Sequence, residues 1–225
     1  MTNAIVLLSG GLDSTTALAW ARKEKQWSCH TIAFDYGQRH RIELQAAAKV
    51  SHILGAVKHH EIKLDMRSIG GSALTDSIDV PKDHSDSDAI PITYVPARNL
   101  IFLSLAAALA EQVEATRIII GANIVDYSGY PDCRPAFLNA FETTVNLGTK
   151  QGVEKSPMKI EAPLLDMTKE EIIALGLRLG VDYSMTHSCY DPSKDGRSCG
   201  HCDSCLFRQQ GFFNLGKQDP LTYAS

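Results

Sequence analysis

Short apolar runs alternate with stretches of helical character along most of the chain. Residues 4–8 form an unbroken apolar run, which is typical of a strand buried in a parallel sheet. A helical stretch from residue 14 to about residue 25 follows, and Thr168 and Glu171 have the spacing of a capping box that opens a later helix. Further strands are predicted at residues 29–35, 59–65 and 117–123, and further helices at 39–54, 99–114, 135–150, 168–180 and 206–215. This alternation predicts an α/β fold, in which a parallel sheet carries helices on both faces.

The size and composition of the chain restrict its class. Its 225 residues suit one or two domains, and we predict an α/β domain over residues 1–185 with a C-terminal segment, residues 186–225, packed on it. A hydrophobic content of 44% and a charged content of 21% are typical of a soluble globular protein. The net charge of −4 argues against a dedicated nucleic-acid binder. The chain has neither a signal-peptide start nor a run of about 20 apolar residues, so we expect a cytoplasmic protein without a membrane partner.

The stretch LLSGGLDST, residues 7–15, joins the first predicted strand to the first helix. Gly10 and Gly11 permit a tight turn, and the hydroxyls of nearby serines and threonines can donate hydrogen bonds. A helix N-terminus at the carboxyl end of a parallel strand is a position that attracts phosphate. No lysine follows the glycines as it does in the common P-loop. We therefore predict a different phosphate loop, in which Asp13 caps the helix or helps to hold Mg²⁺; the alternative is a plain glycine turn with Asp13 as the cap.

Four cysteines near the C-terminus have the spacing of a metal site. Cys189, Cys199, Cys202 and Cys205 follow the pattern C-x9-C-x2-C-x2-C. In a reducing compartment such thiols are more often free or bound to metal than paired in disulfides. Four thiolates suit tetrahedral zinc and leave no position for a catalytic water, so we predict structural Zn²⁺. The alternatives are unpaired buried thiols, disulfides, an iron–sulfur site, or His201 in place of one thiolate.

Two other stretches are polar where a plain fold would not require it. Arg98 and Asn99 precede an apolar helix, at the end where a nucleotide would dock; the alternative is a helix cap by Asn99 and a solvated Arg98. Residues 121–135 follow a buried strand on the same sheet edge as the glycine loop. Carboxylates there can accept the N–H groups of a guanine-like base and tyrosines can stack on it, unless this is an ordinary strand-to-helix loop. The candidate substrate-binding residues are Asn123, Asp126, Tyr127, Tyr130, Asp132 and Arg134.

The string SGGLDS, residues 9–14, resembles the PP-loop signature of the ATP pyrophosphatase superfamily. The resemblance implies an adenine nucleotide alpha hydrolase-like, Rossmann-like fold and cleavage of ATP between its α- and β-phosphates. A substrate oxygen would take the AMP, and Asp13 and Ser14 are the candidate catalytic residues. The candidate ATP-binding residues are Leu8, Ser9, Gly10, Gly11, Leu12, Asp13, Ser14, Thr15, Thr16, Arg39, His40 and Arg98. For His40, a surface position at a helix start is the alternative.

Longer stretches extend the resemblance to nearly the whole chain. SGGLDSTTAL, FDYGQRHRIE, VPARNLIFLS, DYSGYPDCR and the four-cysteine cluster together resemble the 7-cyano-7-deazaguanine synthase family, often called QueC. The resemblance implies conversion of 7-carboxy-7-deazaguanine, ammonia and ATP into the nitrile, in the queuosine pathway of tRNA modification. It also implies Mg²⁺, one zinc per chain and a homodimer. Lys155 and Lys159 precede the stretch IEAPLLD and could contact pyrophosphate.

Other functions share parts of this pattern. A different amidating PP-loop enzyme would share the loop and the ammonia, but it has no reason for the cysteine cluster. A tRNA thiolase could use cysteines, but it needs an RNA-binding surface, which the acidic balance disfavours. A zinc-stabilised nucleotide-binding module would have no activity, and pyrophosphate release that depends on the deazaguanine acid would exclude it.

Overall fold

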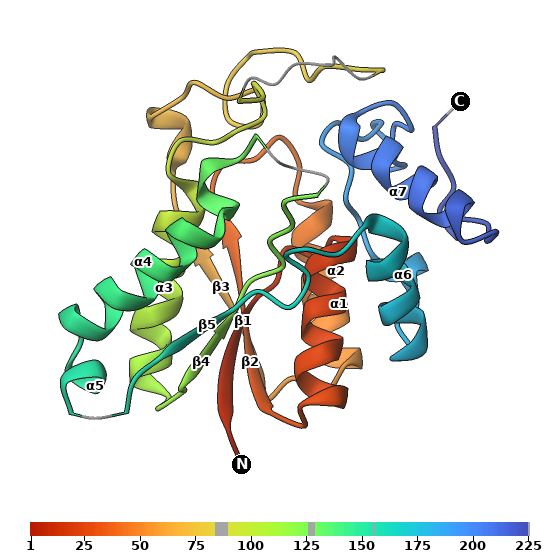
Figure 1. The fold of residues 1–225 in the computed structure, drawn as a ribbon. Coiled ribbons are helices and arrows are strands. Elements are labelled where there is room, and N and C mark those ends of the chain that lie inside the picture. The colour runs from red at the N-terminus through yellow and green to blue at the C-terminus, as the bar shows by residue number, and fades with distance from the viewer. Residues whose placement is uncertain (84–89, 126–128, 155, 225) are drawn as a thin grey trace.

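A parallel sheet forms the centre of the molecule (Figure 1). The structure, a computed structural model, describes residues 1–83, 90–125, 129–154 and 156–224. In these residues the strand order is β3-β2-β1-β4-β5, and every neighbouring pair is parallel. The strands are β1 (Asn3–Leu7), β2 (Ser28–Asp35), β3 (Lys58–Lys63), β4 (Arg117–Ile119) and β5 (Lys159–Glu161). The predicted α/β fold is confirmed, and the strand order reverses between β1 and β4, where open sheets of this kind bind ligands.

Helices cover both faces of the sheet. α1, α2 and α6 lie on one face and α3 and α4 on the other, with α7 packed outside α6 (Figure 1). The α-helices are α1 (Leu12–Ala19), α2 (Ile42–Ile53), α3 (Arg98–Gln112), α4 (Pro135–Gly148), α5 (Lys150–Val153), α6 (Lys169–Arg178) and α7 (Asp203–Asn214). A π-helical turn, η1 (Trp20–Glu24), continues α1, and the 3-10 turns are η2 (Met66–Ser68), η3 (Pro131–Cys133) and η4 (Tyr183–Met185). No helix of the described residues is both long and apolar enough to cross a membrane.

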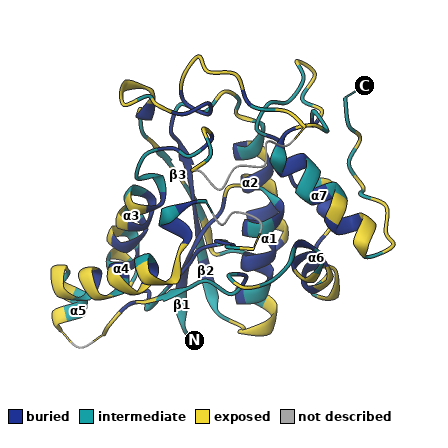
Figure 2. Cartoon of the chain, turned by 45° about the horizontal axis from the view of Figure 1, so that its top comes forward, coloured by how far each residue is buried: buried dark blue, intermediate teal, exposed yellow. Residues whose placement is uncertain are grey.

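The alternation of side chains along β1 divides the core into two parts. Ile5 and Leu7 pack with residues of α3 and α4, while Ala4, Val6 and Leu8 pack with residues of α1, α2 and α6. Successive residues of a strand point to opposite faces, so an unbroken apolar run is what a strand covered on both sides requires. Figure 2 shows the consequence, with buried strands between helices whose outer faces are exposed.

Several element boundaries differ from the predicted ones. α1 begins at Leu12 rather than at residue 14, and its N-cap is Gly11, which makes no side-chain capping bond. The prediction that Asp13 caps this helix is therefore wrong. The capping box of Thr168 and Glu171 is confirmed. β5 and α5 were not predicted, because stretches of three and four residues carry too little periodicity to stand out.

The C-terminal segment shares its core with the sheet. Cys189, Cys202 and Cys205 belong to the same buried cluster as Phe34 and Phe102, which lie on β2 and α3, and the partly buried Cys199 packs against it. The first part of the long loop after β3 also packs there, through Ala73, Leu74 and Val80. The division at residues 185 and 186 stays a prediction, since the core runs across that boundary.

Candidate active site and metal centre

The loop between β1 and α1 is shaped by a close approach of two backbones. Gly10 has φ of +85°, and a Cβ at this position would lie 2.4 Å from the carbonyl oxygen of Glu43 and 2.6 Å from the nitrogen of Ala47. Any side chain here would collide with α2 as well as strain the backbone. Gly10 therefore allows the loop to lie directly against the start of α2, with the N-terminus of α1 facing the sheet edge.

The polar groups of this loop are partnered within the protein. The Oγ atoms of Ser9 and Ser14 are 3.0 Å apart, and the Gly11 amide donates to Ser9 Oγ at 3.3 Å. The Leu12 amide donates to Ser188 Oγ at 3.1 Å, a contact that joins the loop to the C-terminal segment. A phosphate at the α1 N-terminus would replace these weak hydroxyl contacts with charge-assisted ones.

Asp13 forms an ion pair with Lys169, the first residue of α6. Lys169 Nζ donates to both carboxylate oxygens of Asp13, at 2.7 and 2.9 Å, and its side chain is 7% exposed. The pair places one positive and one negative group beside the loop where the charge of ATP would arrive. The sequence analysis did not single out Lys169, because nothing in the neighbouring sequence marks it except its position directly after the N-cap residue Thr168.

Gly121 brings the end of β4 against the same loop. A Cβ on Gly121 would lie 3.0 Å from the Ser14 nitrogen and 3.1 Å from the Asp13 carbonyl carbon. Sheet pairing of β4 ends at Ile119, short of the predicted 123, as the chain turns past the α1 N-terminus. The loop after β1 and the chain after β4 therefore lie side by side at the N-terminus of α1.

A cavity of about 240 Å³ opens beside the loop and reaches into the apolar core. The candidate residues that line it are Leu8, Ser9, Gly11, Leu12, Asp13, Ser14, Arg39, His40, Arg98, Asn123 and Tyr130. Those outside its lining are Gly10, Thr15, Thr16, Asp132 and Arg134. Asp126, Tyr127 and Lys155 lie outside the described residues. The lining therefore contains most of the predicted ATP-binding residues and fewer of the predicted substrate-binding ones, and their roles stay predictions.

Thr15 and Thr16 are buried residues of α1. Both are fully buried, and Thr16 Oγ1 lies 2.9 Å from the Leu12 carbonyl oxygen and 2.7 Å from the Tyr183 hydroxyl. This hydroxyl pair ties α1 to η4 beneath α6. These contacts of Thr16 hold the helix in place behind the loop.

Asp132 is committed to the start of α3. Its Oδ2 accepts a hydrogen bond from the backbone N–H of Asn99 at 3.0 Å, and the side-chain Nδ2 of Asn99 donates to the backbone carbonyl of Asp132 at 3.2 Å. Asn99 does not cap α3, since the N-cap position belongs to Ala97, in the left-handed conformation. Arg98 lines the cavity instead of being fully solvated. Arg134 is exposed at the start of α4.

Asn123 and Tyr130 reach the cavity from the stretch after β4. Asn123 Nδ2 donates to the Leu164 carbonyl at 2.9 Å and also to that of Met167. The Tyr130 hydroxyl lies 2.7 Å from Thr93 Oγ1, with the ring in the cavity wall. Both side chains are fixed by these contacts before any ligand binds.

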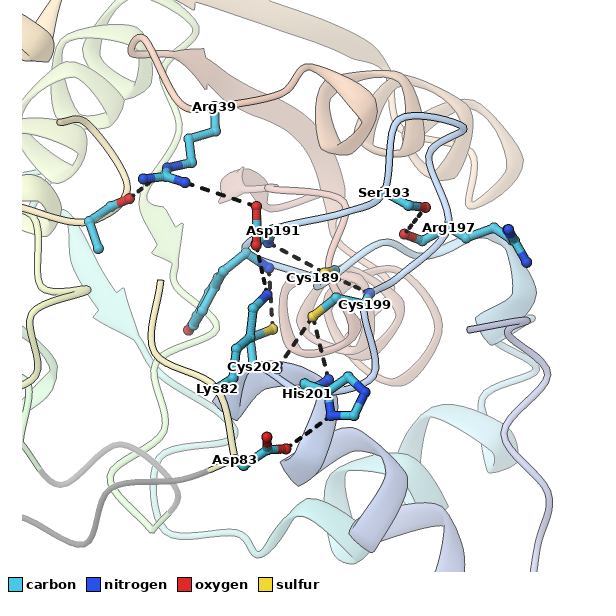
Figure 3. Close-up of polar contacts among 12 residues, drawn as sticks. Arg39, Lys82, Asp83, Cys189, Asp191, Ser193, Arg197, Cys199, His201 and Cys202 are labelled. Carbon is cyan, nitrogen blue, oxygen red and sulfur yellow. Dashed lines mark hydrogen bonds and ion pairs between the residues drawn. The ribbon is translucent and has the colours of Figure 1, made fainter. Parts of the chain in front are cut away.

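Arg39 binds the long loop after β3 and, through Asp191, the cysteine segment. Its Nε donates to the Ala73 carbonyl at 2.9 Å, and its Nη2 donates to the carbonyl of Ile78. Asp191 lies 3.9 Å from Arg39 Nη1 and 2.7 Å from Lys82 Nζ, so it links both cations to the cysteine segment (Figure 3). Arg39 lines the cavity, but these contacts occupy its guanidinium.

His40 and His187 stand edge to face in the cavity wall, with ring centroids 5.4 Å apart. His40 Nδ1 and His187 Nε2 are buried, and neither has a hydrogen-bond partner among the described residues. Burial lowers the pKa of both rings, that of His187 to about 4. The site therefore presents two uncharged imidazoles beside the phosphate loop, and His40 is not the surface residue that the alternative expected.

The four predicted metal ligands come together as one cluster. The Sγ atoms of Cys189, Cys199, Cys202 and Cys205 all lie within 4.8 Å of one another. Tetrahedral zinc, with bonds of about 2.3 Å, holds its thiolates about 3.8 Å apart, so the spacing fits a single ion. No disulfide joins them.

Backbone amides surround these sulfurs. The Cys199 amide donates to Cys189 Sγ at 3.2 Å, and the Cys202 amide donates to Cys199 Sγ at 3.3 Å. Hydrogen bonds with Cys189 and Cys205 lower the pKa of Cys202, while those with Cys189 and Cys202 raise the pKa of Cys205. Zinc binds thiolates, so a metal ion at this cluster would displace the protons of these thiols.

The sequence of the chain matches a known family over residues 3–216, described as "Queuosine biosynthesis protein QueC". The chain belongs to the QueC family. A curated relative from Hydrogenovibrio crunogenus, named 7-cyano-7-deazaguanine synthase, is 59% identical over 99% of this chain and 96% of its own. Relatives of the same name from Alcanivorax borkumensis and Nitrosococcus oceani are each 58% identical, over 99% and 98% of this chain and 100% and 97% of theirs.

Solved structures share the fold at low identity. NMN synthetase from Francisella tularensis is 17% identical, with a TM-score of 0.53 over 96% of this chain and 78% of that one. A predicted subunit of tRNA methyltransferase from Methanocaldococcus jannaschii is 16% identical, with a TM-score of 0.50 over 100% of this chain and 93% of that one. At such identities the likeness supports the α/β architecture alone.

Some cavity residues of this QueC-family chain were not predicted. Phe34 and Phe102 stack with centroids 4.0 Å apart and form an aromatic wall, to which Tyr36 adds an edge. Glu43 and Ser188 also line the cavity. Glu43 falls within the stretch FDYGQRHRIE, which carried the resemblance, and Ser188 precedes the first metal cysteine; both signals were available.

Proposed function

We propose that this chain converts 7-carboxy-7-deazaguanine and ammonia into 7-cyano-7-deazaguanine with ATP, as an enzyme of queuosine biosynthesis. One observation carries the proposal: a PP-loop beside a deep cavity lies within a chain that is 59% identical, over nearly its full length, to a relative of that name. The whole length matters because the loop alone is common to enzymes with other substrates.

The reaction requires two activations of the same carbon. A carboxylate oxygen attacks the α-phosphorus of ATP and releases pyrophosphate, which turns a poor electrophile into an acyl adenylate. Ammonia displaces AMP and gives the amide. The amide oxygen then attacks a second ATP, and loss of AMP gives the nitrile. Each round begins with an oxygen attacking the α-phosphorus, so one loop serves both, mainly by positioning and charge stabilisation.

The residues of the loop suit this work. The Gly11 and Leu12 amides at the α1 N-terminus would donate to phosphate oxygens, with the hydroxyls of Ser9 and Ser14 beside them. Asp13 would hold Mg²⁺ next to the pyrophosphate, and Lys169 would balance its charge when the metal is absent. Asn123 and Tyr130 would meet the deazaguanine, together with the predicted contacts of Asp126, Tyr127, Asp132 and Arg134.

The cysteine cluster would hold one structural Zn²⁺. An iron–sulfur cubane binds each thiolate through a different iron and so holds the sulfurs farther apart than one ion does. Sulfurs within 4.8 Å favour the single ion. Bound zinc would order residues 187–190, which carry Ser188 to the loop. A homodimer and a cytoplasmic location, without a nucleic-acid partner, remain proposals from the family resemblance.

The test is a turnover assay with the purified chain, the deazaguanine acid, ammonium and MgATP. Product by mass spectrometry should be the nitrile, with two AMP and two pyrophosphate released per turnover. Ser14→Ala should lose at least about 100-fold of this rate, while Ser104→Ala, at an exposed helical serine, should not. Absence of acid-dependent pyrophosphate release by the native chain would refute the proposal, and a thiolated or merely amidated product would reassign it.

A further inference from the structure

We infer that Glu43 is the catalytic base of this site, accepting the protons that nitrogen loses as ammonia becomes the amide and the amide becomes the nitrile. The inference rests on the proposed function and assigns a residue to the one task that the PP-loop does not perform. Adenylation of the acid needs no proton acceptor, because a carboxylate oxygen attacks directly. Both nitrogen steps do need one.

The position of Glu43 places its carboxylate beside the phosphate loop. The residue lies in the first turn of α2, and its own carbonyl oxygen is the atom that a side chain on Gly10 would meet at 2.4 Å. Because α2 touches the loop there, Glu43 lines the same cavity as Ser9 and Asp13. A substrate carbon activated by AMP at this loop would lie between these groups.

The surroundings of Glu43 suit a base that must change its charge. The aromatic wall of Phe34 and Phe102 lines the same cavity. Burial raises the pKa of Glu43 to about 7, against the opposing effects of the Arg98 charge and of a hydrogen bond with Gln38. The charged and titratable groups that act on Glu43, or on Arg98 beside it, are Arg98 from α3, Tyr36 from the end of β2, Tyr130 and Asp132 from η3 and its N-cap, and Tyr190 from the cysteine segment.

Other acids and thiols of the cavity are less suited to the task. Asp13 is held by two short contacts with Lys169, whereas Glu43 forms no such ion pair in the described part of the chain. Burial raises the pKa of Cys133 to about 11 and that of Tyr36 to about 12, so both stay protonated near neutrality. The uncharged imidazoles of His40 and His187 are the remaining competitors. The pKa of His187, about 4, makes it the weaker base, so the experiment includes His40.

The proton transfers balance. In the first, the nitrogen of ammonia forms a bond to the adenylated carbon, the bond from that carbon to the AMP oxygen breaks, and one N–H proton passes to the Glu43 carboxylate. The proton leaves to solvent before the second activation. In the second round, the amide oxygen bonds to the α-phosphorus of ATP, pyrophosphate leaves, and the amide nitrogen gives its first proton to Glu43, which releases it to solvent. The electrons of the last N–H bond then form the third carbon–nitrogen bond, the carbon–oxygen bond to AMP breaks, and Glu43 takes this proton too.

The experiment separates adenylation from the nitrogen chemistry. Exchange of labelled pyrophosphate into ATP, dependent on the deazaguanine acid and without ammonia, reports adenylation alone. Nitrile formation reports both. In Glu43→Gln we expect exchange close to the native rate and nitrile formation lower by about 100-fold or more. Glu61→Gln, at an exposed carboxylate on β3, is the matched control and should change neither.

The pH profile gives a second readout. The rate of native nitrile formation should rise as pH increases through about 7, because only the ionised carboxylate accepts a proton. The rate of pyrophosphate exchange should not show this rise. In Glu43→Asp, nitrile formation should be slower but should still rise with pH. This variant tests Glu43 as the base even if the glutamine variant folds poorly.

Two results would overturn the inference. Loss of exchange together with nitrile formation in Glu43→Gln would show that Glu43 binds substrate, for example the N–H edge of the deazaguanine. Native nitrile formation in Glu43→Gln, with its loss in His40→Gln, would assign the base to the histidine. Absence of exchange in the native chain would instead refute the proposed function.

Discussion

The sheet body and the C-terminal segment reach a fixed shape by opposite means. In the body, apolar side chains such as Ile5, Val6 and Ile118 are wholly buried between helices. In the segment, the buried groups include the sulfurs of Cys189, Cys202 and Cys205 and the side chain of Arg208, whose guanidinium binds Asp219 through two bonds of 2.8 and 3.0 Å. Periodic apolar sequence makes a fold by packing, while a segment without it depends on metal and paired charges. The difference matters for function because the segment carries Ser188 into the active site.

The largest effect is expected from breaking the metal cluster. Cys202→Ser should lose the bound zinc and lower the free energy of unfolding by more than about 4 kcal/mol, since the segment has little else to order it. Cys29→Ala, at a buried cysteine of β2 outside the cluster, should keep the metal. Elemental analysis and a melting curve check both variants. Full stability in metal-free Cys202→Ser would show that packing alone holds the segment.

The next effect concerns the charge pair of the same segment. Arg208 is 2% exposed, and Arg208→Met would leave Asp219 buried without its partner, at a cost of about 3–5 kcal/mol. Arg197→Met removes an exposed pair with Asp195 and should cost less than about 1 kcal/mol. Denaturant unfolding of both variants measures the difference. Equal costs would mean that Arg208 contributes only through its apolar stem.

The sheet body holds a half-buried carboxylate that has no such pair among the described residues, and its stability should depend on pH in consequence. Glu43 has a raised pKa of about 7 in the folded state and an ordinary value near 4.5 when unfolded. The folded state therefore holds the proton more tightly, and its contribution to stability is lost as pH rises from about 4.5 to about 7. Glu43→Gln should gain about 3 kcal/mol over the native chain at pH 8 and less than about 1 kcal/mol at pH 5. Denaturant unfolding at the two pH values checks the sign, and an equal gain at both would exclude the titration.

The smallest effect tests packing inside the body, close to the point where the segment begins. A Cβ on Gly176, in α6, would lie 1.9 Å from the Tyr183 hydroxyl, which also contacts Thr16. Gly176→Ala should cost about 1–3 kcal/mol by overpacking. Gly148→Ala, where nothing lies within 4 Å of the added carbon, should be neutral or stabilise α4 by up to about 1 kcal/mol. A neutral Gly176→Ala would show that η4 moves easily against α6.

The local features of this protein could be predicted from sequence. The strand of residues 4–8, the glycine turn at Gly10 and the capping box at Thr168 each rest on neighbours in the chain, whose spacing sets turn and helix geometry. The cysteine cluster is local as well, since three of its members lie within seven residues. The boundaries of helices and strands could be predicted less well, because they depend on contacts with distant residues. At Gly121, for example, the chain leaves β4 to pass α1.

The sequence by itself determined the α/β order, the glycine loop and the spacing of the four cysteines, and with them the family. Only the tertiary structure decided which side chains reach the cavity. In the folded chain, Asp132 accepts a hydrogen bond from the backbone N–H of Asn99, and the packing of α2 places Glu43 beside the loop. Lys169 meets Asp13 across 156 positions, and Ser188 meets Leu12 across 176. Contacts at such separations leave no periodicity or spacing in the chain, because they arise from how helices pack on the sheet and not from neighbouring residues.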